Sequence, residues 1–245
     1  MEEKRNFDLL TLGQVLLRLS PPNNDRLVRG DTFVKQVGGA ELNVAVGVAL
    51  LGLRTGVISK LPSHDMGSFM KGKIRSYGVS DDFFMYDDSP SARVGIYYYE
   101  NGAYPRKPKV IYDRANSSFY SLKIDEIPEK AYTASRCFHT SGITLALSPK
   151  VRETAIEMIK RFKAAGTLVS FDVNFRGNLW TGEEAKECIE QILPYVDIFF
   201  CSEDTARLTF KKTGTAREMM KSFTEEYPIS IVASTQRIVH SPKSH

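Results

Sequence analysis

The sequence predicts an α/β protein with a mostly parallel sheet flanked by helices. Three observations predict this class. The 245 residues have a globular composition, 42% hydrophobic and 25% charged, and suffice to bury a large core. From residue 136 onward, apolar runs of strand length alternate with amphipathic helical stretches, as in right-handed β-α-β units. A tyrosine-rich segment around Asn101-Gly102 has the pattern of an exposed hairpin.

The first 76 residues predict two strands, a turn and two helices. Residues 7–12 and 55–61 are apolar runs typical of buried strands. Between them, residues 21–24 predict a turn and residues 27–37 predict extended pieces. A helix follows, ended by Gly52, and its inward face comprises Leu42, Ala45, Val46, Ala49 and Leu50. Asp65 is expected to cap a second helix with an inward face of Met66, Phe69, Met70 and Ile74.

The middle of the chain predicts a polar hairpin. Residues 93–100 are aromatic and β-branched, and Asn101-Gly102 is a strong turn signal. The return arm, residues 104–113, contains two prolines, which restrict it to a sheet edge. Alternation places either Tyr97 and Tyr99 or Tyr98 toward a ligand. We expect a flap over a site, and an aromatic contact between two copies stays open for its other face.

The second half predicts strands at residues 136–141, 168–173, 198–201 and 229–233. Ser148 is expected to cap a helix with proline in its first turn and Gly166 after its end. Its inward face comprises Ala155, Met158, Ile159 and Phe162. Thr181 and Glu184 form a capping box before another helix, and Ser202 is expected to cap a third.

Composition narrows the possible partners. The net charge of +4 suits an anionic ligand, but the basic residues are scattered, so we expect no nucleic-acid partner. No apolar run reaches membrane-spanning length, so no membrane partner is expected. Three widely spaced cysteines indicate a reduced, cytoplasmic protein, and the four histidines lack metal-ligand spacing. No Gly-x-Gly-x-x-Gly follows the first strand, which disfavours a dinucleotide-binding oxidoreductase.

Two glycines, Gly38 and Gly39, stand where the first helix is expected to begin, and Asn43 follows within its first turns. Bare backbone at a helix N-terminus lets a ligand hydroxyl approach closely, and the Asn43 amide can point the same way. In isolation, the pair is also compatible with a turn that simply starts a helix.

A second polar segment is Asp172-Val-Asn-Phe-Arg176 at the end of a strand. Alternation places Asp172, Asn174 and Arg176 on one side. The Arg176 fork suits a carboxylate or phosphate, while Asp172 and Asn174 suit water, Mg²⁺ or a hydroxyl. A salt-bridged strand end is the alternative. Residues 202–205 are interpreted in isolation as a helix cap with acidic first-turn residues.

Together these motifs resemble a known family. The segment Gly38-Gly-Ala-Glu-Leu-Asn43, followed by Gly52 and Asp65-Met-Gly67, resembles the first signature of the ribokinase-like, or phosphofructokinase-B, carbohydrate kinases. The Tyr97 hairpin, Tyr112-Asp-Arg114, His139-Thr-Ser-Gly-Ile143 and the Asp172–Arg176 segment are similar to 2-dehydro-3-deoxygluconate kinases of that family. The resemblance extends from Phe7 to about Ser241.

The resemblance implies one domain over residues 7–245 whose C-terminal part is missing. It implies a Rossmann-like sheet and a small β-sheet lid, with lid segments at about residues 14–37 and 92–115. The implied activity is ATP-dependent phosphorylation of a sugar hydroxyl with Mg²⁺, in a homodimer joined through the lid. Implied substrate-binding residues are Gly38, Gly39, Asn43, Tyr97, Tyr112, Arg114 and Arg176. For nucleotide or Mg²⁺, the residues are Asp172, Asn174, Ser202, Glu203 and Ser234.

Some family features differ in this sequence. The family's second signature, Asp-x-x-Gly-x-Gly-Asp, supplies the catalytic base and does not occur in the 245 residues. We therefore expect the catalytic Asp to lie beyond residue 245, and we expect this chain alone to be inactive and poorly soluble. Ser202 and Thr205 occupy the positions of an Asn-x-x-Glu element, and Ser234-Thr-Gln-Arg237 replaces a glycine-rich turn.

The leading hypothesis is thus a kinase whose full-length form phosphorylates an acid sugar of the 2-dehydro-3-deoxygluconate type. Arg114 and Arg176 would set the preference for the acid. Two alternatives remain at this stage: a catalytically dead sugar-binding or dimerising protein, and a kinase for a neutral ketose such as fructose.

Overall fold

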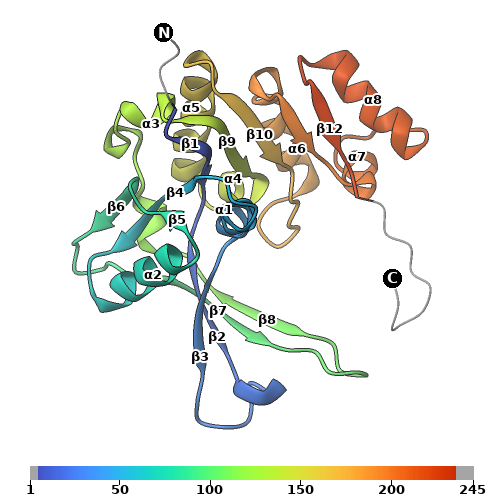
Figure 1. Cartoon of the computed structure of the whole chain (residues 1–245). Helices are drawn as coiled ribbons and strands as arrows, with labels where there is room; N and C mark the ends of the chain where they lie inside the picture. Colours follow the sequence, from blue (N-terminus) through green and yellow to red (C-terminus); the bar gives the residue numbers. More distant parts are fainter. Residues whose placement is uncertain (1–4, 236–245) are drawn as a thin grey trace.

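The computed structural model describes residues 5–235 and contains a large sheet with helices on both faces and a smaller sheet projecting from it (Figure 1). The large sheet has the order β12-β11-β10-β9-β1-β4-β5, with β6 also paired to β4, and its pairings are parallel. Its strands are β1 (Phe7–Leu12), β4 (Thr55–Pro62), β5 (Val79–Ser80), β6 (Phe84–Asp87), β9 (Ser135–Ser141), β10 (Leu168–Asp172), β11 (Ile198–Phe200) and β12 (Ile231–Ala233). The predicted α/β class is confirmed.

The smaller sheet, called the lid sheet below, has the order β3-β2-β7-β8. It consists of β2 (Leu16–Ser20), β3 (Val34–Gly38), β7 (Gly95–Glu100) and β8 (Lys109–Asp113). Two antiparallel pairs, β2–β3 and β7–β8, are joined by a parallel pairing of β2 with β7. β2, β7 and β8 lie within the two predicted lid segments, and β3 ends one residue beyond the first of them, at Gly38. The return arm forms an edge strand as predicted, although its two prolines lie in the loop before β8.

Helices cover the large sheet in two groups, each with its own core. Alternation along β4 directs Ile58 to one core and Val57 to the other. The core with Val57 is closed by α1 (Ala40–Leu50) and α2 (Asp65–Ser76). The opposite core is closed mainly by α4 (Gly142–Ala146), α5 (Pro149–Ala164), α6 (Gly182–Glu190), α7 (Glu203–Leu208) and α8 (Ala216–Glu226), with the short α3 (Lys130–Thr133) at its edge.

Part of the sheet face that carries α1 and α2 is open to solvent. The strands β10, β11 and β12 direct Phe171, Phe199 and other side chains into the helix-covered core. Their alternate side chains Leu168, Phe200 and Ile231 are 51%, 41% and 54% exposed. Apolar side chains exposed together in this way favour association with another surface.

His139 on β9 lies on this same face and is a buried titratable group. Its ring is 5% exposed, and its Nδ1 lies 2.9 Å from the Ser170 hydroxyl. Burial lowers the pKa of His139 from 6.5 to about 4 because the charged imidazolium loses its hydration.

This lowered pKa predicts an acid-sensitive fold. Since the unfolded chain binds the His139 proton from about pH 6.5 downward and the native chain only near pH 4, stability is lost as the pH falls through that window. Between pH 7 and pH 5 we expect His139 to remove about 2 kcal/mol from the free energy of unfolding. Denaturant unfolding at both pH values should show a difference of this size that shrinks in His139→Asn. An equal pH dependence in both proteins would contradict the assignment.

The predicted helix caps are mostly confirmed. The hydroxyls of Ser148, Thr181 and Ser202 each accept a hydrogen bond from a backbone N–H of the helix that follows. The prediction that Asp65 caps α2 is wrong. His64 is the cap, with its Nδ1 accepting from Met66 N at 3.2 Å, and Asp65 is the first helical residue, where its negative charge favours the helix N-terminus.

One further prediction is wrong. Leu50 does not belong to the inward face of α1, because it is 80% exposed whereas Leu42 and Ala45 are buried. Eight residues beyond Leu42, an α-helix has rotated about 80° past its starting direction, which turns Leu50 toward solvent. Of the extended pieces predicted within residues 27–37, one is β3, which spans Val34–Gly38.

The hairpin turn is longer than Asn101-Gly102 predicts. Residues 101–108 join β7 to β8, with a bridge between Ala103 and Arg106. The buried Glu100 carboxylate explains the larger loop, because it pairs with Arg106 and also accepts a hydrogen bond from Leu27 N at 2.8 Å.

The outer face of the lid sheet exposes Phe33 and Ile111, each 45% accessible. A homodimer through the lid stays a prediction.

Residues 236–245, including Gln236-Arg237 and the end of the predicted domain, lie outside the described residues.

Candidate functional site

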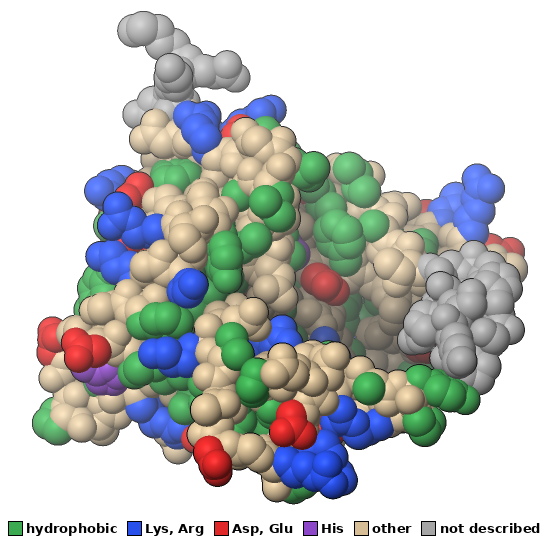
Figure 2. Space-filling model, turned by 60° about the horizontal axis from the view of Figure 1, so that its bottom comes forward, with side chains coloured by type: hydrophobic (Ala, Val, Ile, Leu, Met, Phe, Trp, Pro, Cys, Tyr) green, Lys and Arg blue, Asp and Glu red, His purple; other side chains and the backbone are tan. Residues whose placement is uncertain are grey.

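A cavity of about 400 Å³ lies between the lid sheet, the N-terminus of α1 and the loop after β10. Figure 2, which brings the lid side forward, shows the molecule hollowed between the lid and the body. Six of the seven residues predicted to bind substrate line this first cavity: Gly39, Asn43, Tyr97, Tyr112, Arg114 and Arg176. They come from four separate parts of the chain, so the fold brings together what the sequence keeps apart.

The glycine pair contributes through close packing. Gly39 has a φ of 149°, and a Cβ there would lie 2.7 Å from the Gln14 carbonyl oxygen. It occupies the N-cap position of α1 without a side-chain cap, so the first N–H groups of the helix face the cavity unprotected by a side chain. Gly38 does not line the cavity. A Cβ at Gly38 would lie 2.5 Å from the Tyr97 hydroxyl, so this glycine makes room for the tyrosine that does.

Three guanidinium groups line the first cavity, those of Arg18, Arg114 and Arg176. The Arg114 side chain is half-buried and the Arg176 side chain is exposed. Burial lowers the pKa of Arg114, and the nearby positive charge of Arg176 acts in the same direction. The arginine ion pairs among the described residues involve other side chains, and neither Arg114 nor Arg176 takes part in one. Arg114 and Arg176 can therefore receive an external anion without giving up an ion pair.

The lid sheet presents one aromatic face to this cavity. Its register pairs Arg18 with Tyr97 and Tyr97 with Tyr112, which places the three side chains on the same face. The Tyr97 and Tyr112 rings lie 5.9 Å apart, and the Arg18 guanidinium lies 4.3 Å from the centre of the Tyr99 ring. Of the two alternating sets, Tyr97 and Tyr99 line the cavity, while Tyr98 packs near Phe33.

A second cavity of about 370 Å³ opens on the other side of the loop after β10. Four of the five residues predicted to bind nucleotide or Mg²⁺ line it: Asp172, Asn174, Ser202 and Ser234. Burial raises the pKa of Asp172, against the opposing effects of the Asn174 N–H and the Arg176 charge. The loop thus forms a wall between the cavities, with Asn174 facing one and Arg176 the other.

The prediction that Asp172, Asn174 and Arg176 share one side is therefore wrong. Asn174 has a φ of 37°, in the left-handed region, and its N–H donates to Asp172 Oδ1 at 2.9 Å. This local turn breaks the strand alternation on which the prediction depends.

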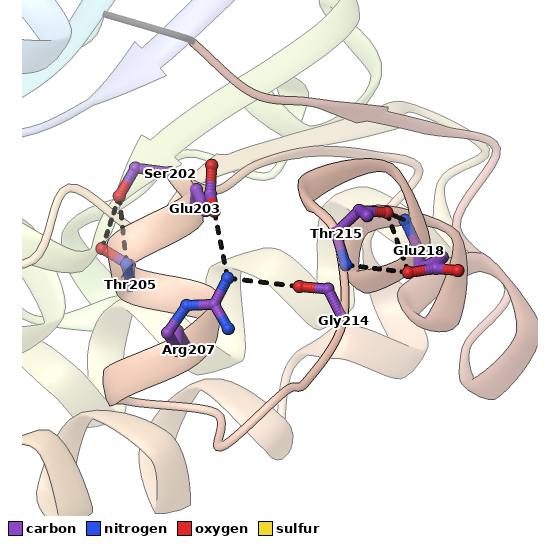
Figure 3. Close-up of polar contacts among 7 residues, drawn as sticks. All are labelled: Ser202, Glu203, Thr205, Arg207, Gly214, Thr215 and Glu218. Carbon is purple, nitrogen blue, oxygen red and sulfur yellow. Dashed lines mark hydrogen bonds and ion pairs between the residues drawn. The ribbon is translucent and has the colours of Figure 1, made fainter.

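Glu203 does not line either cavity. Figure 3 shows its carboxylate turned toward Arg207, whose Nη2 donates to Glu203 at 3.0 Å and to the Gly214 carbonyl at 3.2 Å. Ser202 caps the helix and also donates to Thr205 Oγ1 at 2.8 Å. The interpretation of residues 202–205 as a helix cap with acidic first-turn residues describes this geometry.

Three polar residues of this region were not predicted. Arg18 lines the first cavity, and its place one strand away from Tyr97 cannot be seen without the sheet register. Gln14 holds Arg114, as described below. Glu41 is 2% exposed and accepts hydrogen bonds from Ser141 Oγ at 2.6 Å and Thr144 Oγ1 at 2.8 Å, which ties α1 to α4. Burial raises the pKa of Glu41.

Among residues 5–235, no cluster of three His, Cys, Asp or Glu side chains has a metal-binding arrangement. None of the helices in this range has both the length and the apolar character needed to cross a membrane.

Comparisons with known proteins agree with this architecture. The model of the pfkB family of carbohydrate kinases matches residues 6–236. A 2-dehydro-3-deoxygalactonokinase of Haloferax volcanii is 34% identical over 229 residues, which cover 94% of this chain and 71% of the relative. The crystal structure of a 2-dehydro-3-deoxygluconokinase from Thermotoga maritima superposes with a TM-score of 0.86 at 32% identity, covering 92% of this chain and 71% of that one.

A third similar structure contains a nucleotide. It is an uncharacterised sugar kinase from Pyrococcus horikoshii in complex with ATP, with a TM-score of 0.72 and 25% identity, covering 83% of this chain and 66% of that chain.

Proposed function

Because the chain belongs to the pfkB family of carbohydrate kinases, we propose that it binds an acid sugar of the 2-dehydro-3-deoxygluconate type as the acceptor of a phosphoryl group from ATP. The observation that carries the acid preference is that Arg114 and Arg176, on the first cavity, form no ion pair within residues 5–235. The names of the Haloferax and Thermotoga relatives support the same substrate class.

The first cavity suits such a sugar at both of its ends. Arg114 and Arg176 bind the carboxylate, since guanidinium forks match carboxylate geometry. The uncapped N-terminus of α1 and the Asn43 amide bind hydroxyls close to the Gly39 backbone. The faces of Tyr97 and Tyr112 cover the sugar from the lid and exclude water from it. Together these groups orient one hydroxyl toward the wall formed by the loop after β10, which is the positioning that phosphoryl transfer needs.

The second cavity suits the nucleotide and its Mg²⁺. Mg²⁺ commonly takes one or two protein carboxylates and completes its shell with phosphates and water. Asp172 offers such a carboxylate, and its Oδ1 is oriented by the Asn174 N–H. The hydroxyls of Ser202 and Ser234 line the same space. When bound, Mg²⁺ supplies charge neutralisation to the phosphates.

The geometry of the two cavities supports two other functions less well. A neutral ketose such as fructose would leave the Arg114 and Arg176 charges without a partner. A sugar-binding protein without nucleotide binding would leave the second cavity without a use.

Calorimetric titration of this chain tests the proposal, because binding can be measured independently of turnover. We expect 2-dehydro-3-deoxygluconate to bind at least about tenfold more tightly than fructose, which corresponds to about 1.4 kcal/mol. Added salt should weaken the binding of the acid sugar, because that binding depends on charge. The affinity for fructose should stay nearly unchanged. ATP with Mg²⁺ should bind as well.

The opposite results separate the alternatives. Equal affinities for the acid sugar and fructose would overturn the acid-sugar proposal in favour of the neutral ketose. Sugar binding without any ATP binding would favour the sugar-binding protein.

A further inference from the structure

We propose that Gln14 is a positioning residue whose carboxamide fixes the Arg114 guanidinium so that its terminal edge is presented to the substrate carboxylate. This inference deepens the proposed function and rests on it for the identity of the anion. Gln14 follows β1 and precedes β2, a hundred residues from Arg114, and neither the motifs nor the predicted site residues include it.

The carboxamide holds Arg114 at two points. Its Oε1 accepts from Arg114 Nε at 2.8 Å, and its Nε2 donates to the Arg114 carbonyl oxygen at 3.1 Å. The same Nε2 donates to the buried Ser117 hydroxyl at 2.6 Å. Because these three bonds use both N–H groups and the oxygen of the amide, the amide cannot flip without losing them.

The choice of Nε decides which edge of the guanidinium stays available. A guanidinium binds a carboxylate either through its two terminal nitrogens or through Nε and one of them. Gln14 occupies Nε, and no hydrogen bond among the described residues uses Nη1 or Nη2 of Arg114. The terminal edge is thus the one left for a bidentate bond to an incoming carboxylate.

The Gln14 amide is also neutral and buried, and both properties suit it to orient the Arg114 guanidinium. Gln14 is 3% exposed, so its bonds to Arg114 form without competition from water. An amide orients the guanidinium without cancelling its positive charge. Holding the arginine in place before binding also lowers the side-chain entropy that binding would otherwise cost.

The surrounding fold leaves room for this arrangement. Gly95 at the start of β7 faces the amide, and a Cβ there would lie 2.7 Å from Gln14 Nε2. Strand β7 carries Tyr97 and Tyr99, so the same strand that accommodates Gln14 also provides the aromatic face of the first cavity.

The test compares Gln14→Leu, which has similar size but no hydrogen bonds, with Gln14→Glu, which keeps an acceptor for Arg114 Nε. In calorimetric titrations, Gln14→Leu should raise the Kd for 2-dehydro-3-deoxygluconate about tenfold, as expected for a lost hydrogen bond to a charged group. The Kd for fructose should change less than about twofold. Gln14→Glu should keep Arg114 in place but recover little of the lost affinity, because its carboxylate cancels the positive charge to which the substrate carboxylate binds. The matched control is Gln191→Leu, which removes a single exposed hydrogen bond far from the cavity.

A spectroscopic readout examines the contact without any sugar. The Arg114 Nε–H, identified by its loss in Arg114→Lys, should exchange slowly with water in the wild-type protein. Exchange should be faster in Gln14→Leu and slow again in Gln14→Glu. If Gln14→Leu does not fold, Gln14→Met gives the same comparison with a more adaptable apolar side chain.

The outcomes separate the inference from the proposed function. Unchanged acid-sugar affinity in a folded Gln14→Leu protein would overturn the positioning role while leaving the acid-sugar preference intact. A wild-type protein that does not prefer the acid sugar would overturn the proposed function. In that case the Nε–H exchange alone decides whether Gln14 fixes Arg114, and equal exchange in the wild-type and Leu proteins would refute it.

Discussion

Replacing Arg176 by alanine is expected to raise the Kd for 2-dehydro-3-deoxygluconate between about tenfold and a hundredfold. A hydrogen bond to a charged group contributes about 1.5–3 kcal/mol, and no ion pair in the described part of the chain engages Arg176. Fructose lacks the carboxylate, so its Kd should stay close to the wild-type value. Titration calorimetry of both sugars measures this selectivity directly.

Arg217→Ala is the control for the change in net charge. Arg217 is exposed on α8, and its replacement should leave both affinities unchanged. Arg176→Lys should restore only part of the acid-sugar affinity, because an ammonium keeps the charge but not the planar fork. A comparable loss for fructose in Arg176→Ala would show that Arg176 acts on the sugar in general and not on its carboxylate.

Replacing Gly142 by alanine is expected to destabilise the protein and to weaken sugar binding at the same time. Gly142 is the first residue of α4, and a Cβ there would lie 2.1 Å from the Val173 carbonyl oxygen. The obstacle is backbone, so no change of rotamer can relieve it. Overpacking of a buried position costs about 1–3 kcal/mol. The residue displaced, Val173, begins the loop that places Arg176 in the first cavity, so the Kd for the acid sugar should rise as well.

Gly47→Ala is the matched control. Gly47 lies inside α1, and a Cβ there would meet nothing within 4 Å. Alanine should therefore increase the free energy of unfolding by about 0.5–1 kcal/mol through helix propensity and leave sugar binding unchanged. Denaturant unfolding and calorimetry are measured on both variants. A Gly142→Ala protein as stable as the wild type would contradict the close approach of β10 to α4.

The sequence predicts the body of this protein well because its signals are local. The strands from β9 to β12 are apolar runs of strand length, and the capping box at Thr181 depends on four consecutive residues. The same signal occurs at Thr215 and Glu218, where it opens α8, a helix that the sequence analysis left out. That helix could have been found with the rule already used for Thr181.

The sequence assigns a sugar set and a nucleotide set of residues, and most of each set lines one of the two cavities. The shape of the loop between the cavities is not predicted. Alternation fails after Asp172 because a single left-handed residue, Asn174, redirects the chain. Gln14 escapes prediction for a different reason: its partner Arg114 is a hundred residues away, and only tertiary structure brings them together. Gly38 was assigned to substrate, whereas it makes room for Tyr97. The Gln14–Arg114 bond and the close approach of Gly38 to Tyr97 depend on contacts between distant segments, whereas the turn at Asn174 is local.

The parallel pairing of β2 with β7 has a consequence for the folding of the chain. Leu16 and Gly95 are register partners, yet 78 residues that include α1, β4 and α2 separate them. Bringing these strands together closes a long loop and costs conformational entropy. Contacts formed earlier within that loop must compensate this cost. The lid sheet should thus form after the large sheet and its helices have folded. A peptide containing only β2–β3 or only β7–β8 would lack the strand that pairs with its inner edge.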